Sequence, residues 1–147
     1  MIINTELKGL KEATRNLNRR LKQVKNYTEK GVTDVVLDCL GKSVPRAPVD
    51  TGDLRGSGFA RVNNTTVASG PGRGSTALSV KEAAGAAAGD KVEGVTGFSA
   101  PYAVVQHEDL SFNHPKGGEA KYLERTVVEN TEKWINHLRK SAKKGLE

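Results

Sequence analysis

The sequence predicts an α+β fold, in which helices pack on a small antiparallel sheet of about four strands. Apolar residues recur at helical spacing near both ends of the chain, and short runs rich in β-forming residues lie between them. Glycine, proline and asparagine separate these runs, as is typical of turns. With 147 residues and no internal repeat, the chain is expected to be a single domain over residues 1–147.

The first expected element is a helix from about residue 7 to residue 24. Its apolar residues recur at spacings of three, seven, four and three: Leu7, Leu10, Leu17, Leu21 and Val24. The other positions are mostly charged or polar, so this narrow stripe predicts a helix that lies on a partner surface. Asn4 or Thr5 is the expected N-terminal cap.

A second apolar series predicts helix from about Thr28 to Ser43. Its members are Val32, Val35, Val36, Cys39 and Leu40. Because glycine weakens a helix, we expect either one bent helix or two helices with a break between Asn26 and Gly31. Pro45 and Pro48 are expected to end the helix, since a residue before proline is pushed out of the α region.

Two pairs of strands are expected after these helices. Asn63 and Asn64 separate two β-forming runs, which predicts a strand, a turn and a strand. The second pair is expected at residues 91–98 and 102–108, on either side of Ser-Ala-Pro.

A flexible insertion is expected between the strand pairs, and a helix at the end of the chain. The insertion spans about residues 70–90, is rich in glycine and alanine, and is predicted to hold a short helix around Leu78–Ala84. The last helix is expected over about Glu119–Lys144, with one apolar face formed by Leu123, Val127, Thr131, Trp134 and Leu138.

The tripeptide Asp50-Thr51-Gly52 has the spelling that aspartic proteases use to present a catalytic carboxylate. Those enzymes need two carboxylates that share a proton. Prolines at 45 and 48 make the preceding residues a poor central strand, so a turn is favoured over a protease site. In that turn the Asp50 carboxylate is expected to accept hydrogen bonds from backbone amides, and Gly52 to supply an unusual dihedral.

Four possible metal ligands lie within eight residues: His107, Glu108, Asp109 and His114. Their spacing matches no metal signature, so a polar loop that closes a sheet edge is favoured over a metal site. The glycines of residues 70–75 lack the lysine of a phosphate-binding loop. We therefore predict no catalytic residue, no cofactor and no enzyme activity.

The net charge of +6 is concentrated in two segments, residues 15–25 and 137–145. Such segments either contact nucleic acid or form solvated helix faces, and the lack of interleaved aromatic residues favours the second interpretation. No apolar run approaches the ~20 residues that cross a bilayer, so no membrane partner is expected.

Three motifs in order resemble a family of long-tailed bacteriophage proteins. These are APVDTGDLRGS, PYAVVQHE and GGEAKYLE, the last of which leads into the final helix. The family is that of neck and tail-completion proteins, the gene-product-ten-like tail components of lambdoid phages, some of which are called minor capsid proteins. Its members look like structural subunits of rings at the head–tail junction.

The resemblance implies fold-defining or interface roles for residues that match its motifs. It implies a turn and first strand at Asp50, Thr51, Gly52 and Leu54, an inward strand and its end at Tyr102, Ala103, His107 and Glu108, and a helix opening at Tyr122 and Leu123. The insertion of residues 70–90 is longer than the family pattern suggests.

The resemblance also implies partners and a location. The chain is expected to form a ring with copies of itself, by analogy a hexamer, between a connector or head-closure protein and the tail tube protein. It would be found in the virion, after assembly in the bacterial host cytoplasm. DNA would pass through the lumen without sequence readout, past Arg19, Arg20, Lys22, Lys25 and Arg73. The alternative is a basic, non-sequence-specific nucleic-acid-binding module.

Overall fold

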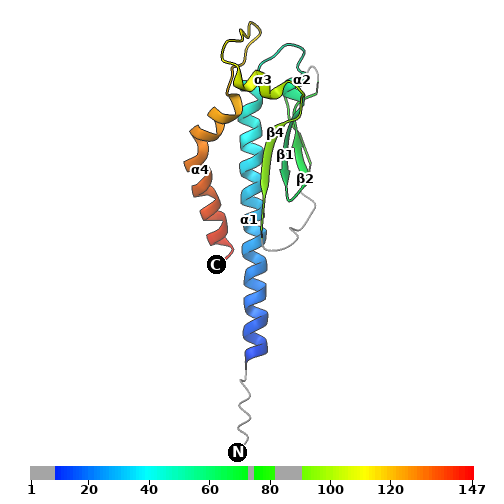
Figure 1. Ribbon diagram of the computed structural model, residues 1–147. Coiled ribbons are helices and arrows are strands. Elements are labelled where there is room, and N and C mark those ends of the chain that lie inside the picture. Colours follow the sequence, from blue (N-terminus) through cyan, green and yellow to red (C-terminus); the bar gives the residue numbers. More distant parts are fainter. Residues whose placement is uncertain (1–8, 73–74, 82–90) are drawn as a thin grey trace, which may run out of the picture.

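A computed structural model describes residues 9–72, 75–81 and 91–147. Its elements in chain order are α1 (Leu10–Arg46), α2 (Asp53–Gly56), β1 (Gly58–Val62), β2 (Thr65–Ser69), β3 (Ser79–Val80), β4 (Gly94–Phe98), α3 (Ala103–Glu108) and α4 (Tyr122–Lys144). Helix α1 is the spine of the molecule, with the sheet on one side and α4 on another (Figure 1). The predicted α+β fold is confirmed.

Helix α1 is one continuous helix. Of the two expected alternatives, a single helix is therefore correct and a break between Asn26 and Gly31 is wrong. Gly31 is buried, and a Cβ there would lie 2.7 Å from the hydroxyl oxygen of Ser141 in α4. The glycine therefore permits close helix packing and does not interrupt the helix. The helix also continues through Pro45 to Arg46, slightly beyond the predicted end. The predicted caps Asn4 and Thr5 lie outside the described residues.

The sheet has four strands in the order β3-β2-β1-β4, and all neighbours are antiparallel. The predicted turn between β1 and β2 is confirmed: Asn63 and Asn64 have φ of 49° and 65°. Positive φ at both positions gives a tight turn the twist that the flanking strands need.

The predicted strand at residues 102–108 is wrong, because this segment forms the short helix α3. Ala103 is its buried residue, whereas Val104 and Val105 are 71% and 52% exposed. Adjacent apolar residues in a short run do not distinguish a strand from a helix.

The fourth strand is instead β3, which lies in the expected insertion. Ser79 and Val80 pair with Ser69 and Ala68 of β2. The helix predicted around Leu78–Ala84 is therefore wrong at residues 79–80, and residues 82–84 lie outside the described part of the chain.

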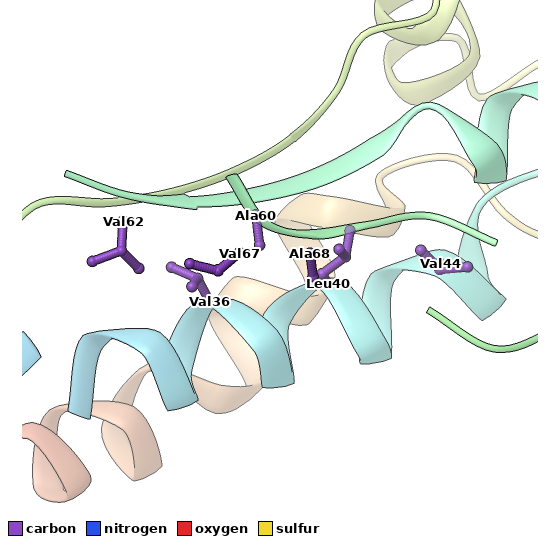
Figure 2. Packing of buried hydrophobic residues seen from close by; sticks show 7 residues of the cluster. All are labelled: Val36, Leu40, Val44, Ala60, Val62, Val67 and Ala68. Atoms are coloured by element: carbon purple, nitrogen blue, oxygen red, sulfur yellow. The ribbon is translucent and has the colours of Figure 1, made fainter. Parts of the chain in front are cut away.

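A thin aliphatic core lies between α1 and the sheet. Val36, Leu40 and Val44 are spaced four residues apart on α1, so they form one row facing β1 and β2 (Figure 2). The strands contribute Ala60, Val62, Val67 and Ala68. Because many of these side chains are small, helix and sheet approach closely and a modest apolar surface suffices to join them.

Helix α4 packs against α1 through a face that only partly matches the predicted one, which is correct at Trp134 and Leu138 and wrong at Val127 and Thr131. Its buried residues are Tyr122, Thr126 and Trp134, at multiples of four residues, while Val127 is 41% exposed and Thr131 is also exposed. A row at this spacing is a ridge suited to packing in the groove of another helix. The indole Nε1 of Trp134 donates to Asp38 Oδ2 at 2.7 Å, which fixes the pair.

Candidate functional site

Most of the motif residues gather at the end of the molecule where α1 finishes. There α2, α3 and the start of α4 meet (Figure 1). A second apolar cluster forms beneath them from Ala47, Leu54, Ala103 and Tyr122, all at most 5% exposed. Three motifs that are distant in sequence therefore share one small core.

His107 joins α3 to α4. Its Nε2 accepts a hydrogen bond from the backbone amide of Glu124 at 3.3 Å, and its Nδ1 lies 2.7 Å from Glu108 Oε1. A backbone N–H is always a donor, so the Nε2 is the acceptor and the ring proton is on Nδ1, directed at the carboxylate. The backbone carbonyl of His107 also accepts a hydrogen bond from the Lys121 amide at 2.7 Å.

Lys121 lies between two carboxylates at this joint. Its ammonium group contacts Glu108 and lies 3.0 Å from Glu124 Oε2. These contacts raise the pKa of Lys121, through Glu108 first and then Glu124. They lower the pKa of Glu108, through hydrogen bonds from Lys121 and then His107.

The joint contains two of the four candidate metal ligands, His107 and Glu108, whereas Asp109 accepts hydrogen bonds from Ser111 and His114 lines a groove elsewhere. Ligand atoms of His107, Glu108 and Glu124 lie within 4.8 Å of one another. However, both ring nitrogens of His107 already have hydrogen-bond partners, and the Lys121 ammonium supplies the positive charge that the carboxylates need. This arrangement fits a structural joint between α3 and α4 better than a metal centre.

Tyr122 is the buried centre of the joint and is 1% exposed. Its hydroxyl donates to the Ala103 carbonyl at 3.2 Å, and its ring meets those of Phe98 and His107 edge-on at 5.0 Å. Burial raises the pKa of Tyr122 to about 12. The resemblance places Tyr122 and Leu123 at a helix opening, and α4 begins at Tyr122.

The Asp50 turn differs in detail from the prediction, and Leu54, expected at the first strand, lies in helix α2 because the chain makes one more helical turn before β1 begins at Gly58. The Asp50 side chain is 85% exposed and its carboxylate binds Lys116 Nζ at 2.7 Å, where backbone amides were expected. The neighbouring Thr51 hydroxyl lies 2.6 Å from Asp53 Oδ2. Gly52 has φ of 90°, as the turn prediction requires. The contact between Asp50 and a lysine is not the pairing of carboxylates on which an aspartic protease depends.

Arg55 is a structural residue that the sequence reasoning missed. Its guanidinium donates to the carbonyls of Ala47 at 2.9 Å and Pro45 at 2.7 Å. It thus satisfies backbone carbonyls that the end of α1 leaves without helical partners. Burial lowers the pKa of Arg55. An arginine nine residues beyond a helix carries no sequence signal for this role.

A groove with a volume of about 590 Å³ opens beside the Asp50 turn. Its walls are residues 48–54 on one side and Tyr102, Gln106 and residues 112–116 on the other. Tyr102 and Phe112 are each 43% exposed at its rim, and the His114 Nε2 is buried without a hydrogen-bond partner among the described residues. The groove therefore combines the carboxylates of Asp50 and Asp53 with the exposed rings of Tyr102 and Phe112.

The expected DNA contacts lie at the other end of α1, except that Arg73 is outside the described residues. Arg19, Arg20 and Lys22 are exposed, and Arg20 donates to the Leu146 carbonyl at 2.9 Å. Lys25 is half-buried.

The antiparallel packing of α4 brings the second basic segment to the same region. Lys30 of α1 and Lys144 of α4 both lie over the Tyr27 ring, 5.8 and 5.5 Å from its centroid. Basic residues of α1 and α4 that are far apart in sequence thus become neighbours, which sequence spacing alone did not reveal.

None of the helices in the described part of the chain combines the length and apolarity that crossing a bilayer requires. No protein-family model, no curated protein and no solved structure matches the chain.

Proposed function

We propose that the chain is a structural subunit of a ring at the head–tail junction of a long-tailed bacteriophage. In this role it completes the tail and joins it to the DNA-filled head. The support from sequence is the order of the three motifs, whose residues lie together around one joint. The support from structure is a surface that a single chain leaves uncovered.

That surface is the N-terminal part of α1, and it is the observation that carries the proposal. Residues 9–23 are all exposed, and this part of the helix extends beyond both the sheet and α4 (Figure 1). Leu10, Leu17 and Leu21 are 58–59% exposed on it. A projecting helix with an apolar stripe is typical of a subunit that neighbours complete.

Deletion of the gene from the phage or prophage that encodes it tests the proposal. Electron micrographs of the induced lysate should show filled heads beside separate tails of normal length if the protein joins the two. Tails of abnormal length would assign it to tail termination. Complementation with the wild-type gene is the control, and intact infectious particles without the gene would contradict the proposal.

A second candidate function is binding of nucleic acid by the basic helices alone. The meeting of basic residues of α1 and α4 around Tyr27 favours it. Contact with phosphates would make the affinity for duplex DNA fall steeply as salt rises. Binding that is undetectable at low salt would remove this candidate.

A further inference from the structure

The α1 face that packs against α4 repeats every seven residues. Val24, Gly31 and Asp38 have this spacing, so they lie on one face of the helix. A Cβ at Gly145 would lie 2.5 Å from the Cα of Val24, and the Trp134 indole donates to Asp38. Gly31, between them, is the point where α4 approaches most closely to its Cα. Val24, Gly31 and Asp38 therefore define the seam between α1 and α4.

The exposed leucines continue this seam on the N-terminal side of Val24. Leu17 and Leu10 extend the seven-residue spacing and Leu21 lies beside them, yet all three are 58–59% exposed. A straight helix drifts by about 20° per heptad from this spacing, so Leu10 stays within about 40° of Val24. The seam is uncovered there because α4 ends at its C-cap Gly145. The leucine stripe is thus the bare continuation of a helix–helix interface.

The bare part of the seam has the dimensions of one short helix. Residues 10–23 span about 20 Å at 1.5 Å per residue. Helices α2 and α3 have only 4 and 6 residues, and α4 already lies on the seam further along. Of the described helices, the one with the required length and an unoccupied leucine stripe is the N-terminal part of α1 itself. It can only come from another copy.

We propose that residues 10–23 of two copies of the chain pair as antiparallel helices, each covering the leucine stripe of the other. Leu10 of one copy then packs against Leu21 of the other, and Leu17 packs against Thr14. The contact is reciprocal and therefore isologous, and in a ring it would join copies in pairs while another surface connects the pairs. This inference rests on the proposed function in one respect, since it names the neighbour that covers the surface on which that proposal depends.

The end of α4 selects the antiparallel register. Because α1 begins at Leu10, the helix of the other copy begins beside Leu21, about one turn from Val24, where α4 ends. It runs in the same direction as α4, so its N-terminus follows the C-terminus of α4. This brings opposite ends of two helix dipoles together, which is favourable. In a parallel pair, the α4 helices of both copies would compete for the space between the two α1 helices.

The basic residues are placed so that they tolerate this pairing. Three of them lie roughly 120–180° around the helix from Leu10, on the outer side: Arg15, Arg19 and Lys22. Beside the stripe, Lys11 faces Asn18 of the other copy. Arg20 faces Ala13 in the same way. No two cations are directly opposite at these positions, and the outer ones remain exposed for contact with phosphates.

Sedimentation equilibrium of the full-length protein tests the pairing. The wild type should dimerise, and Leu17→Asp with Leu21→Asp should weaken the dimer by about 100-fold or more, because each change occurs twice in it. Asn16→Asp with Gln23→Asp is the matched control, since it adds the same charges at exposed positions outside the stripe. The control should associate at least as well as the wild type. Circular dichroism should be unchanged in both variants, because all four positions are exposed.

Cysteine cross-linking tests the orientation. Thr14→Cys and Leu17→Cys variants, one of them carrying a size tag, are mixed and oxidised with oxidised glutathione. Antiparallel pairing predicts disulfides between the two different variants, whereas parallel pairing predicts them within each variant. The native Cys39 is 5% exposed and gives the background in the unsubstituted protein.

Three results would overturn the inference. They are a wild type that stays monomeric at millimolar concentration, a Leu17→Asp, Leu21→Asp variant that associates as well as its control, and cross-links that form only between identical variants. Each of them can be told apart from failure of the proposed function. Dimerisation of a protein whose deletion leaves the phage intact would retain the pairing and reject the neck role. Loss of the head–tail joint on deletion, with a monomeric wild type, would retain the role and show that a different protein covers the stripe.

Discussion

The imidazole of His107 accepts a hydrogen bond from the backbone amide of Glu124, at 3.3 Å, and so caps a helix to which it does not belong. The first amides of a helix have no partner within it, and Lys121, at the N-cap position of α4, makes no capping hydrogen bond with its side chain. His107 supplies that hydrogen bond from α3. The residues that carry the family resemblance therefore include the one that joins the two helices.

Replacement of His107 by alanine should destabilise the fold. The variant loses a helix cap and an edge-on ring contact with Tyr122, which together are worth about 1–2 kcal/mol. Chemical denaturation followed by circular dichroism measures the loss. His137→Ala is the matched control, because that exposed residue makes a surface contact with Asp34 worth at most about 1 kcal/mol. Equal losses in both variants would contradict the capping role.

Two glycines of α1 should respond to alanine with opposite signs. Alanine favours a helix over glycine by about 1 kcal/mol. At Gly41 the new Cβ would be 3.8 Å from Leu78, an ordinary contact, so Gly41→Ala should stabilise the protein. At Gly31 the Cβ would meet Ser141 at 2.7 Å, so Gly31→Ala should destabilise it by about 1–3 kcal/mol. Thermal unfolding of both variants checks this, and stabilisation by Gly31→Ala would show that α4 does not pack closely there.

Asp38 should make stability depend on pH in the acid range. Burial opposes ionisation of Asp38, but hydrogen bonds from Lys42 and Trp134 outweigh it and lower the pKa below its ordinary 3.8. The native state then binds fewer protons than the unfolded chain, so this contribution is complete above pH 3.8 and is lost as the pH falls through the folded pKa. Asp38→Asn should lower the melting temperature at pH 6, and the difference from wild type should shrink toward pH 2. A constant difference would contradict this origin.

The basic end of α1 should contact phosphates if DNA passes along it. Arg19→Ser with Lys22→Ser should then reduce the slope of log affinity against log salt by about 2, since each phosphate contact contributes about 0.9. Fluorescence anisotropy of a labelled duplex measures the slope. Lys91→Ser with Lys81→Ser is the control, because both lysines are exposed near the sheet. Equal slopes for the two double variants would exclude this end of α1 as the DNA contact.

The sequence predicts an element correctly where the preference of its own residues agrees with the packing around them. Asn63 and Asn64 tolerate positive φ wherever they occur, and the helical spacing in α1 and α4 extends over several turns. It does not predict the structure correctly where contacts with distant segments outweigh the local preference. Gly31 weakens an isolated helix, yet Ser141 of α4 requires it for close approach.

The sequence motifs identify many residues of the candidate site, but they do not predict which helix or strand holds each residue or which residues contact one another. Short apolar runs do not separate helix from strand, so Val104 and Val105 were expected in a sheet and are exposed on α3. The contacts of Lys116 with Asp50, and of Arg55 with the end of α1, join segments with no shared local pattern. Only the folded chain shows that the Asp50 turn and α3 form one groove.

Immunogold labelling of intact virions tests the central claim most directly, because it locates the protein in the particle. Antibodies against the purified chain should place gold at the junction between head and tail, and particles from a deletion strain complemented in trans should regain that label. Label confined to the capsid surface or the distal tail, or absent from virions that contain every other structural protein, would contradict the account.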